Sequence, residues 1–160
     1  MKRLSQDSYK QARDYVSEKG RDIERRLLEY HFDGATKESV IEALSEYQNP
    51  DGGFGNALEP DAQAADSSAY LTTIALRILR EVGATAKDGI VQRTIEYLVS
   101  SYDPESSVWP IVPAAVDSAP HATWWNFEKT SADSGRIQKP KSSATFTSFP
   151  RMFRQTYWIG

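Results

Sequence analysis

Apolar side chains recur every three or four positions through about the first hundred residues, and charged side chains occupy most positions between them. This is the period of a helix that buries one face, so it predicts four helical stretches. They span residues 6–32, 36–47, 67–82 and 88–102. The first is either one long helix or two helices joined near Gly20. No stretch alternates with the two-residue period of a half-buried strand, and we therefore expect an all-α domain.

Glycines and capping residues separate the predicted helices. Gly83 follows the third stretch, in the position where a left-handed residue ends a helix. Thr36 and Asp88 precede the second and fourth stretches, and the third begins at one of the two serines at 67 and 68. The predicted core face of the third stretch consists of Leu71, Ile74, Ala75, Ile78 and Val82. These ends divide the chain into two or three helical hairpins.

The loop between the second and third stretches carries the densest signal in the chain. Residues 48–54 read Gln-Asn-Pro-Asp-Gly-Gly-Phe. Proline presets φ, asparagine and aspartate bond to their own backbone, and glycine reaches positive φ without strain, so the string predicts a tight turn. We expect its polar side chains to satisfy helix ends and its ring to pack across them. The residues given this structural role are Gln48, Asp51, Gly52, Gly53 and Phe54.

A second turn is similar to the first. Residues 102–109, Tyr-Asp-Pro-Glu-Ser-Ser-Val-Trp, again place an acidic proline turn, two small residues and an aromatic residue after a helix. The displacement of about 54 residues lies near the upper end of the periods of helical-hairpin repeats. The alternative is coincidence, because proline turns after helices are common. The two turns favour a degenerate internal repeat.

Residues 48–55 resemble the Gln-and-aromatic repeat of squalene cyclases and other terpenoid cyclases, in which a Gln is followed by spacer residues, an acid, a Gly and a Trp or Phe. They are also similar to the Asp-Gly-Gly-Phe turns of protein prenyltransferase β subunits. The likeness covers about residues 40–125. It implies an α/α toroid, in which repeat turns tie helix ends together at the rim. With two or three hairpins the chain would be a partial toroid with long turns, and a truncated or frame-shifted member of that superfamily is one interpretation.

The chemistry of those families is not visible in the sequence. Type II terpenoid cyclases use an Asp-x-Asp-Asp cluster as a strong acid, and the chain has no such string. Protein prenyltransferases hold zinc with Asp, Cys and His, and the chain has no cysteine. Cysteine-ligated zinc is therefore excluded. The resemblance implies a scaffold, and no catalytic residue is assigned.

Three acids lie between the first turn and the third helical stretch. Glu59, Asp61 and Asp66 offer the hard oxygen ligands that a divalent cation such as magnesium prefers, and a diphosphate substrate would require such a cation. The competing interpretation is that Asp66 caps the third helix or places a charge in its first turn, and that the other acids are solvated. The sequence leaves both interpretations open.

Aromatic residues gather after the fourth helical stretch. Trp109, His121, Trp124 and Trp125 lie among prolines, and together with Tyr70 they are the predicted substrate-binding residues. Such a set could line an apolar pocket or face a cation through ring contacts. His121 could equally be a structural residue packed under the tryptophans.

Charge divides the chain into two parts. Residues 1–133 contain 14 Lys and Arg against 22 Asp and Glu, whereas residues 134–160 contain five Lys and Arg and no acid. We expect a toroid-like helical domain over the first part and a basic, irregular tail over the second. The formal net charge of −3 argues against nucleic acid as a partner, and no apolar run has the length of a membrane span or a signal peptide. The expected location is cytoplasmic.

Three functions are compatible with these observations. The first is binding of an isoprenoid or another long apolar small molecule in a toroid cavity. The second is a non-catalytic helical-repeat module that uses an apolar face as an interface with a protein partner or as a homo-oligomer. The third is a fragment of an α/α-barrel carbohydrate-active enzyme, because such folds also use paired carboxylates and aromatic platforms. Fold analogy alone does not separate them.

Overall fold

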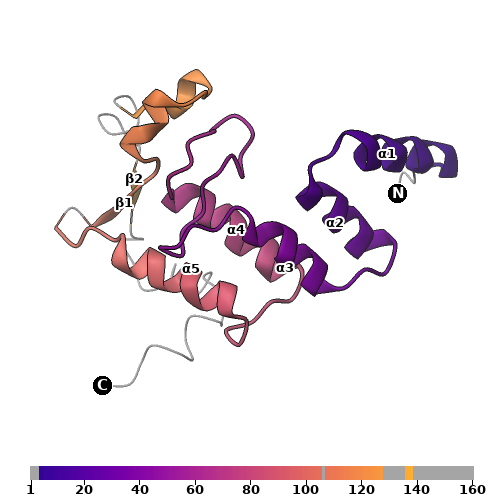
Figure 1. The fold of residues 1–160 in the computed structure, drawn as a ribbon, viewed down its shortest axis with the longest axis horizontal. Helices are drawn as coiled ribbons and strands as arrows, with labels where there is room; N and C mark the ends of the chain where they lie inside the picture. Colours follow the sequence, from indigo (N-terminus) through magenta and orange to yellow (C-terminus); the bar gives the residue numbers. More distant parts are fainter. Residues whose placement is uncertain (1–3, 106, 128–135, 139–160) are drawn as a thin grey trace. The chain divides into compact units, whose positions relative to one another are not determined.

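The computed structural model describes residues 4–105, 107–127 and 136–138, which are mainly helical (Figure 1). The chain divides into two compact units, Met1–Glu46 and Tyr47–Gly160. Among the described residues, no helix has the length and the hydropathy to cross a membrane. Each unit is a separate set of packed elements.

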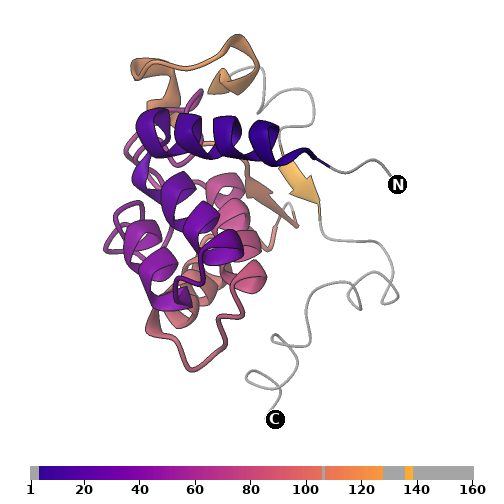
Figure 2. The same ribbon diagram turned by 90° about the vertical axis from the view of Figure 1, so that its right-hand side faces the viewer.

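The first unit contains three helices, α1 (Gln6–Lys19), α2 (Asp22–Phe32) and α3 (Lys37–Ser45). The first predicted stretch is thus two helices, and Figure 2 shows the change of direction between α1 and α2. The backbone leaves the helical conformation at Gly20, whose ψ is 150° and whose N–H donates to the carbonyl of Val16 at 2.9 Å. Along the chain, α1 packs against α2 and α2 packs against α3.

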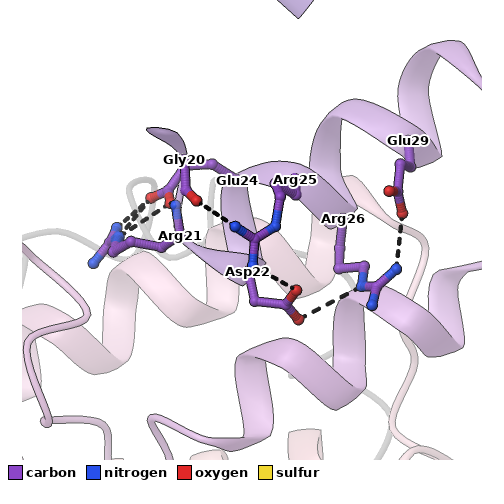
Figure 3. A network of polar contacts seen from close by, with 7 residues as sticks. All are labelled: Gly20, Arg21, Asp22, Glu24, Arg25, Arg26 and Glu29. Atoms are coloured by element: carbon purple, nitrogen blue, oxygen red, sulfur yellow. Dashed lines mark hydrogen bonds and ion pairs between the residues drawn. The ribbon is translucent and has the colours of Figure 1, made fainter. Parts of the chain in front are cut away.

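A network of polar contacts surrounds the start of α2 (Figure 3). The Glu24 carboxylate accepts from the backbone N–H of Arg21 at 2.8 Å and from the Arg21 guanidinium. The Glu24 half of a capping box is thus in place, whereas the guanidinium of Arg21 has only donors and accepts nothing from the helix backbone. Asp22 lies within 3.2 Å of the guanidinium of Arg25 and within 3.5 Å of that of Arg26. The side chains of this turn therefore satisfy one another and the backbone donor that precedes the helix.

Two opposing effects act on the pKa of Glu24. Partial burial by itself raises the pKa, whereas the hydrogen bonds and the charge of Arg21 lower it, and the balance lies below the usual value for a glutamate. The carboxylate is consequently charged at neutral pH. Because both side chains of the pair are partly exposed, the pair stabilises the unit by no more than about 1 kcal/mol.

The described residues of the second unit form one helical hairpin, two short 3₁₀ helices and a pair of short strands. In chain order these are α4 (Ala69–Glu81), α5 (Gly89–Ser100), β1 (Val108–Pro110), η1 (Ala114–Ser118), η2 (Thr123–Trp125) and β2 (Arg136–Gln138). α4 begins after Ser68, whose Oγ accepts from the backbone N–H of Leu71 at 3.3 Å. Of the two predicted caps, the second is therefore the one in use.

The described residues are helix-rich with little strand, in agreement with the expected all-α class, and two three-residue strands are the exception. β1 and β2 pair antiparallel, with Val108 opposite Gln138 and Pro110 opposite Arg136. The segment predicted to be irregular thus contains a three-residue strand. Strands of this length are too short for a two-residue alternation to stand out in a sequence. The predicted boundary between residues 133 and 134 lies outside the described residues.

The hairpin of α4 and α5 buries a core that differs in part from the predicted one. Leu71, Ala75 and Val82 are buried as predicted, whereas Ile74 and Ile78 are only partly buried. The buried stripe of α4 is therefore rotated from the predicted one. It includes Thr72 and Leu79, which are not among the predicted core residues.

Two threonines are fully buried in this hairpin, Thr72 on α4 and Thr94 on α5. The hydroxyl of Thr72 donates to the carbonyl of Ser68 at 2.7 Å, and that of Thr94 donates to the carbonyl of Ile90 at 2.6 Å. Each hydroxyl hydrogen is thus satisfied within its own helix, and each hydroxyl oxygen is left as an acceptor. Both oxygens accept from the loop that precedes α4.

Candidate functional site

The first turn is closed by backbone and side-chain hydrogen bonds. The backbone N–H of Asn49 donates to the carbonyl of Gly53 at 2.8 Å, and that of Gly52 donates to the carbonyl of Asn49 at 2.9 Å. Asp51 Oδ1 accepts from the backbone N–H of Gly53 at 2.9 Å and from Ser67 Oγ at 2.7 Å. Gly52 has a φ of 88°. The turn therefore has the geometry that its aspartate and glycines predict.

Gln48 ties this turn to α5. Its Nε2 lies 3.0 Å from the carbonyl of Gly52, 3.2 Å from the carbonyl of Ile90 and 3.2 Å from Thr94 Oγ1. Its Oε1 accepts from Arg93 Nε at 3.0 Å and from Arg93 Nη2 at 2.7 Å. Both ends of the amide are therefore engaged by residues more than forty positions later in the chain, and the side chain has a structural role.

Phe54 ties the same turn to α4. Its side chain is fully buried, and its backbone N–H donates to Thr72 Oγ1 at 3.0 Å. Its carbonyl accepts from the backbone N–H of Ser68, the N-cap of α4, at 2.9 Å. The ring and the backbone of one residue thereby join the turn to the beginning of the next helix.

The glycines of this loop allow close packing. A Cβ at Gly52 would lie 2.2 Å from the backbone oxygen of Arg93, and one at Gly53 would lie 2.7 Å from Cε2 of Tyr97. A Cβ at Gly55 would lie 2.2 Å from the backbone oxygen of Ala65. Contacts this short do not occur for real side chains, so the loop packs against α5 and against itself only because these positions lack a Cβ.

The contact with α5 also changes the acidity of Tyr97. Burial of the phenol raises the pKa of Tyr97 to about 12, and the nearby negative charge of Asp51 acts in the same direction. Both effects disfavour the phenolate. The phenol is therefore protonated at neutral pH and serves as a packing surface for the turn.

A shallow depression of about 430 Å³ lies beside the turn and is open to solvent. It is lined by Asn49, Pro50, Asp51, Ala65, Asp66 and Ser67. Asn49 Nδ2 donates to the carbonyl of Ala65 at 2.8 Å, and Asp51 accepts from Ser67. The polar groups that line this depression largely bond to one another, which gives it a structural role.

The predicted magnesium ligands do not converge. In the part of the chain that the structure describes, no group of three or more His, Cys, Asp or Glu residues is arranged to hold a metal ion. Asp66 is exposed, and Glu59 and Asp61 are partly buried. Closeness along a loop does not bring carboxylates together, because the loop between Glu59 and Asp66 turns away to pack on other segments.

Asp61 instead binds two consecutive tryptophans. Its Oδ2 accepts from Trp124 Nε1 at 3.1 Å, and its Oδ1 accepts from Trp125 Nε1 at 2.9 Å. The ring centroids of Trp125 and Tyr70 lie 4.9 Å apart. We call Asp61, Tyr70, Trp124 and Trp125 the aromatic edge. It unites three of the predicted substrate-binding residues and one of the predicted metal ligands.

The aromatic edge rests on two chain segments that run side by side. The backbone of Ala62 bridges to that of His121, and the N–H of Gln63 donates to the carbonyl of Pro120 at 3.1 Å. In Figure 1 the segment containing η1 and η2 lies beside the loop that leads into α4. Within the aromatic edge, Trp125 packs against a small apolar cluster of Ala64, Val112 and Val116.

Within this edge Trp124 and Trp125 differ sharply in exposure. Trp125 is partly buried, whereas Trp124 is 65% exposed even though its indole N–H is bonded to Asp61. The hydrogen bond and the short η2 helix restrict the orientation of the Trp124 ring. The result is a large aromatic surface that is both oriented and open to solvent.

The two other predicted binding residues have local partners. Trp109 Nε1 donates to the carbonyl of Leu98 at 2.7 Å, and the Trp109 ring lies 4.6 Å from that of Tyr102. His121 Nδ1 lies 2.7 Å from the carbonyl of Ala119. Because a carbonyl can only accept, this contact places the proton on Nδ1. Trp109 and His121 therefore have structural contacts.

The second turn shares some of the geometry of the first. The backbones of Asp103 and Val108 exchange hydrogen bonds of 3.0 and 3.3 Å. Asp103 Oδ1 accepts from the backbone N–H of Glu105 at 3.0 Å, and Ser107 has a φ of 57°. An aspartate-bonded turn thus follows α5 as well, with its bonds in a different register from those of the first turn.

Several residues that hold the site were not predicted. They are Thr72, Arg93 and Thr94. The threonines interrupt the apolar stripes of α4 and α5, and such an interruption is a usable signal for a buried acceptor. The pairing of Asp61 with the tryptophans spans more than sixty residues, and no local pattern marks it.

Comparison with protein-family models, with curated proteins and with solved structures found no match for this chain. Its function must therefore be inferred from the aromatic edge and from the loop that supports it.

Proposed function

We propose that the chain is a non-catalytic helical-repeat module that binds a protein partner through the aromatic edge. The observation that carries this proposal is the 65% exposure of Trp124 together with its bond to Asp61. Tryptophan is enriched among the residues that dominate binding energy in protein interfaces. A ring that is already oriented loses little conformational freedom when a partner covers it.

The polar groups around the edge support binding over catalysis. Asp61 accepts from two indoles, and His121 is bonded through Nδ1 to a backbone carbonyl. A general acid or base needs a position from which it can reach the substrate, and a nucleophile needs a base beside it. The described residues of this edge offer hydrogen bonds that fix rings in place.

A peptide-display selection tests this function. Random peptides are selected on the folded chain and then counter-selected on a Trp124→Ser variant, with Val99→Ala as a matched control because Val99 is an exposed apolar residue of α5. We expect peptides that bind the parent and the Val99→Ala variant but lose binding to Trp124→Ser. Failure to enrich peptides that depend on Trp124 would contradict the proposed function. Sedimentation of the parent alone shows whether the partner is a second copy of the chain.

A second candidate is the one that the resemblance implies, an α/α-toroid relative that binds an isoprenoid. It is favoured by the way Gln48 and Phe54 join the ends of separate helices, which is the role that repeat turns have in a toroid. Tyr70 and Trp125 would supply the aromatic contact. Tryptophan fluorescence during titration with farnesol, and with farnesyl diphosphate and magnesium, tests it. Saturable quenching supports this candidate, and an unchanged spectrum eliminates it.

A further inference from the structure

The two segments that build the aromatic edge contain acidic residues but no basic ones. Residues 55–76 and 101–127 contain six Asp or Glu and no Lys or Arg. Three of these acids, Glu59, Asp61 and Asp66, lie in the loop that leads into α4, and Asp117 in η1 accepts from the backbone N–H of Phe127 at 2.8 Å. The charged residues of the two segments that carry the aromatic edge are therefore all acidic, and one of them, Asp61, contacts the Trp124 ring directly.

Asp61 places a negative charge directly beside the Trp124 ring. Its two oxygens accept from the indoles of Trp124 and Trp125, and among the described residues no Lys or Arg forms an ion pair with it. The indole bonds leave the carboxylate charge in place, beside a ring whose face is itself negative because of its quadrupole. A cation above the Trp124 face would interact favourably with the ring and with the carboxylate.

We propose that the aromatic edge recognises an arginine side chain of a basic peptide segment in a protein partner, with the guanidinium stacked on the face of Trp124 and drawn by the charge of Asp61. Arginine fits better than lysine because its guanidinium is planar, stacks on aromatic rings and is weakly hydrated. This inference rests on the proposed function, and it specifies the chemistry of the partner.

The probe is a pair of short blocked peptides, Gly-Arg-Gly and its citrulline counterpart, which has nearly the same shape and no charge. Binding is followed through the indole N–H signals in a ¹H–¹⁵N spectrum, because the chain has four tryptophans. Loss of one signal in a Trp124→Phe variant identifies that of Trp124. We expect the arginine peptide to shift this signal and to bind roughly tenfold more tightly than the citrulline peptide.

Three variants separate the ring from the charge. Trp124→Leu keeps an apolar side chain but removes the ring, so the preference for arginine over citrulline should disappear. Asp61→Asn should weaken arginine binding and reduce its dependence on salt. Glu59→Gln is the matched control, since it makes the same change of acid to amide without a contact to the indoles, and it should bind within about twofold of the parent. Circular dichroism establishes that each variant is folded.

The outcomes distinguish this inference from the function on which it rests. Equal binding of the two peptides, or an arginine preference that persists in Trp124→Leu, would overturn the arginine inference. Peptides from the display selection that depend on Trp124 but lack Arg would overturn it as well, while leaving the protein-binding function intact. Binding of a malto- or xylo-oligosaccharide at the Trp124 signal, with no peptide bound, would overturn both and favour the carbohydrate interpretation.

Discussion

The two proline turns of this chain follow similar local rules but are anchored differently. In each, an aspartate accepts from the backbone N–H two residues later, at 2.9 Å for Asp51 and 3.0 Å for Asp103. Each also contains a residue at positive φ, Gly52 in the first turn and Ser107 in the second. A few residues are thus enough to specify a turn of this kind.

The residues that hold the two turns in place lie at different distances from them along the chain. The first turn bonds through Gln48 to Thr94 and through Phe54 to Thr72, so it joins α4 to α5. The second is held by Trp109, which donates to Leu98 on the helix that precedes it. The comparison indicates that the first turn is a joint between helices and that the second is the end of one helix.

The largest effect is expected for Phe54→Ala. The ring is fully buried, and truncation of a buried phenylalanine typically costs about 3–5 kcal/mol in the free energy of unfolding. Trp109→Ala is the counterpart in the second turn, and we expect a smaller loss of about 1–3 kcal/mol because this ring is only partly buried. Urea unfolding of both variants measures the difference. Equal losses would remove the distinction between a joint and a helix end.

Gly52→Ala should be the next most damaging change. The new Cβ would meet the Arg93 backbone oxygen at 2.2 Å, and the φ of 88° is unfavourable for alanine. Strain and overpacking together predict a loss of about 2–4 kcal/mol. Gly83→Ala is the matched control, since its φ is 75° and no atom lies within 4 Å of the added Cβ.

Gly83→Ala should lower the free energy of unfolding only by the cost of placing alanine at positive φ, about 1–2 kcal/mol. Thermal melts of the two glycine variants give the comparison. If both variants lose the same stability, the close approach of the first turn to α5 contributes nothing beyond the backbone conformation.

The contrast between the turns also shows which features could be predicted from the sequence. The helix periods and caps predicted α1 to α5 with ends within about two residues, because apolar spacing and capping residues act locally. The end of α3 at Ser45 was missed by two residues. The carbonyl of Tyr47 accepts from the N–H of Gly55, so Tyr47 is held by the first turn and not by α3. The spacing of apolar residues does not reveal this contact, because it joins residues eight positions apart.

The site could be predicted only in its residue types. Tyr70, Trp124 and Trp125 were selected as binding residues and do lie together, but Trp109 is anchored elsewhere on Leu98. The acid that joins them, Asp61, was predicted as a metal ligand. Which acceptor an indole finds depends on chain segments more than sixty residues apart, and a linear pattern carries no information about that distance.

Removal of a threonine acceptor is expected to have an intermediate effect. Thr72→Val would leave the buried N–H of Phe54 without the oxygen that it now reaches at 3.0 Å, and an unsatisfied buried donor costs about 1–3 kcal/mol. Thr94→Val should cost less, because Nε2 of Gln48 also lies near two backbone carbonyls. Urea midpoints of the two variants test this order, and a reversed order would show that the anchor on α5 is the stronger one.

The smallest effect is a dependence on alkaline pH that only the first turn should show. The pKa of Tyr97 is raised to about 12 from the usual tyrosine value of 10.0, first by burial and then by the charge of Asp51. The folded chain therefore holds the Tyr97 proton at pH values where the unfolded chain has begun to release it. Its contribution to stability is complete below about pH 10 and is lost as the pH rises toward 12.

Two variants isolate this contribution from those of the other tyrosines. In Tyr97→Phe the group is absent, so the stability of the parent relative to this variant should fall between pH 10 and pH 12. Asp51→Asn removes the repulsive charge, so the decline should still begin near pH 10, where the unfolded chain releases its proton, but should end at lower pH and be smaller because the Tyr97 phenolate forms more easily. Urea unfolding at a series of alkaline pH values measures both curves. If the Asp51→Asn and parent curves coincide, burial alone sets the pKa of Tyr97, and the carboxylate of the first turn acts only through its hydrogen bonds to Gly53 and Ser67.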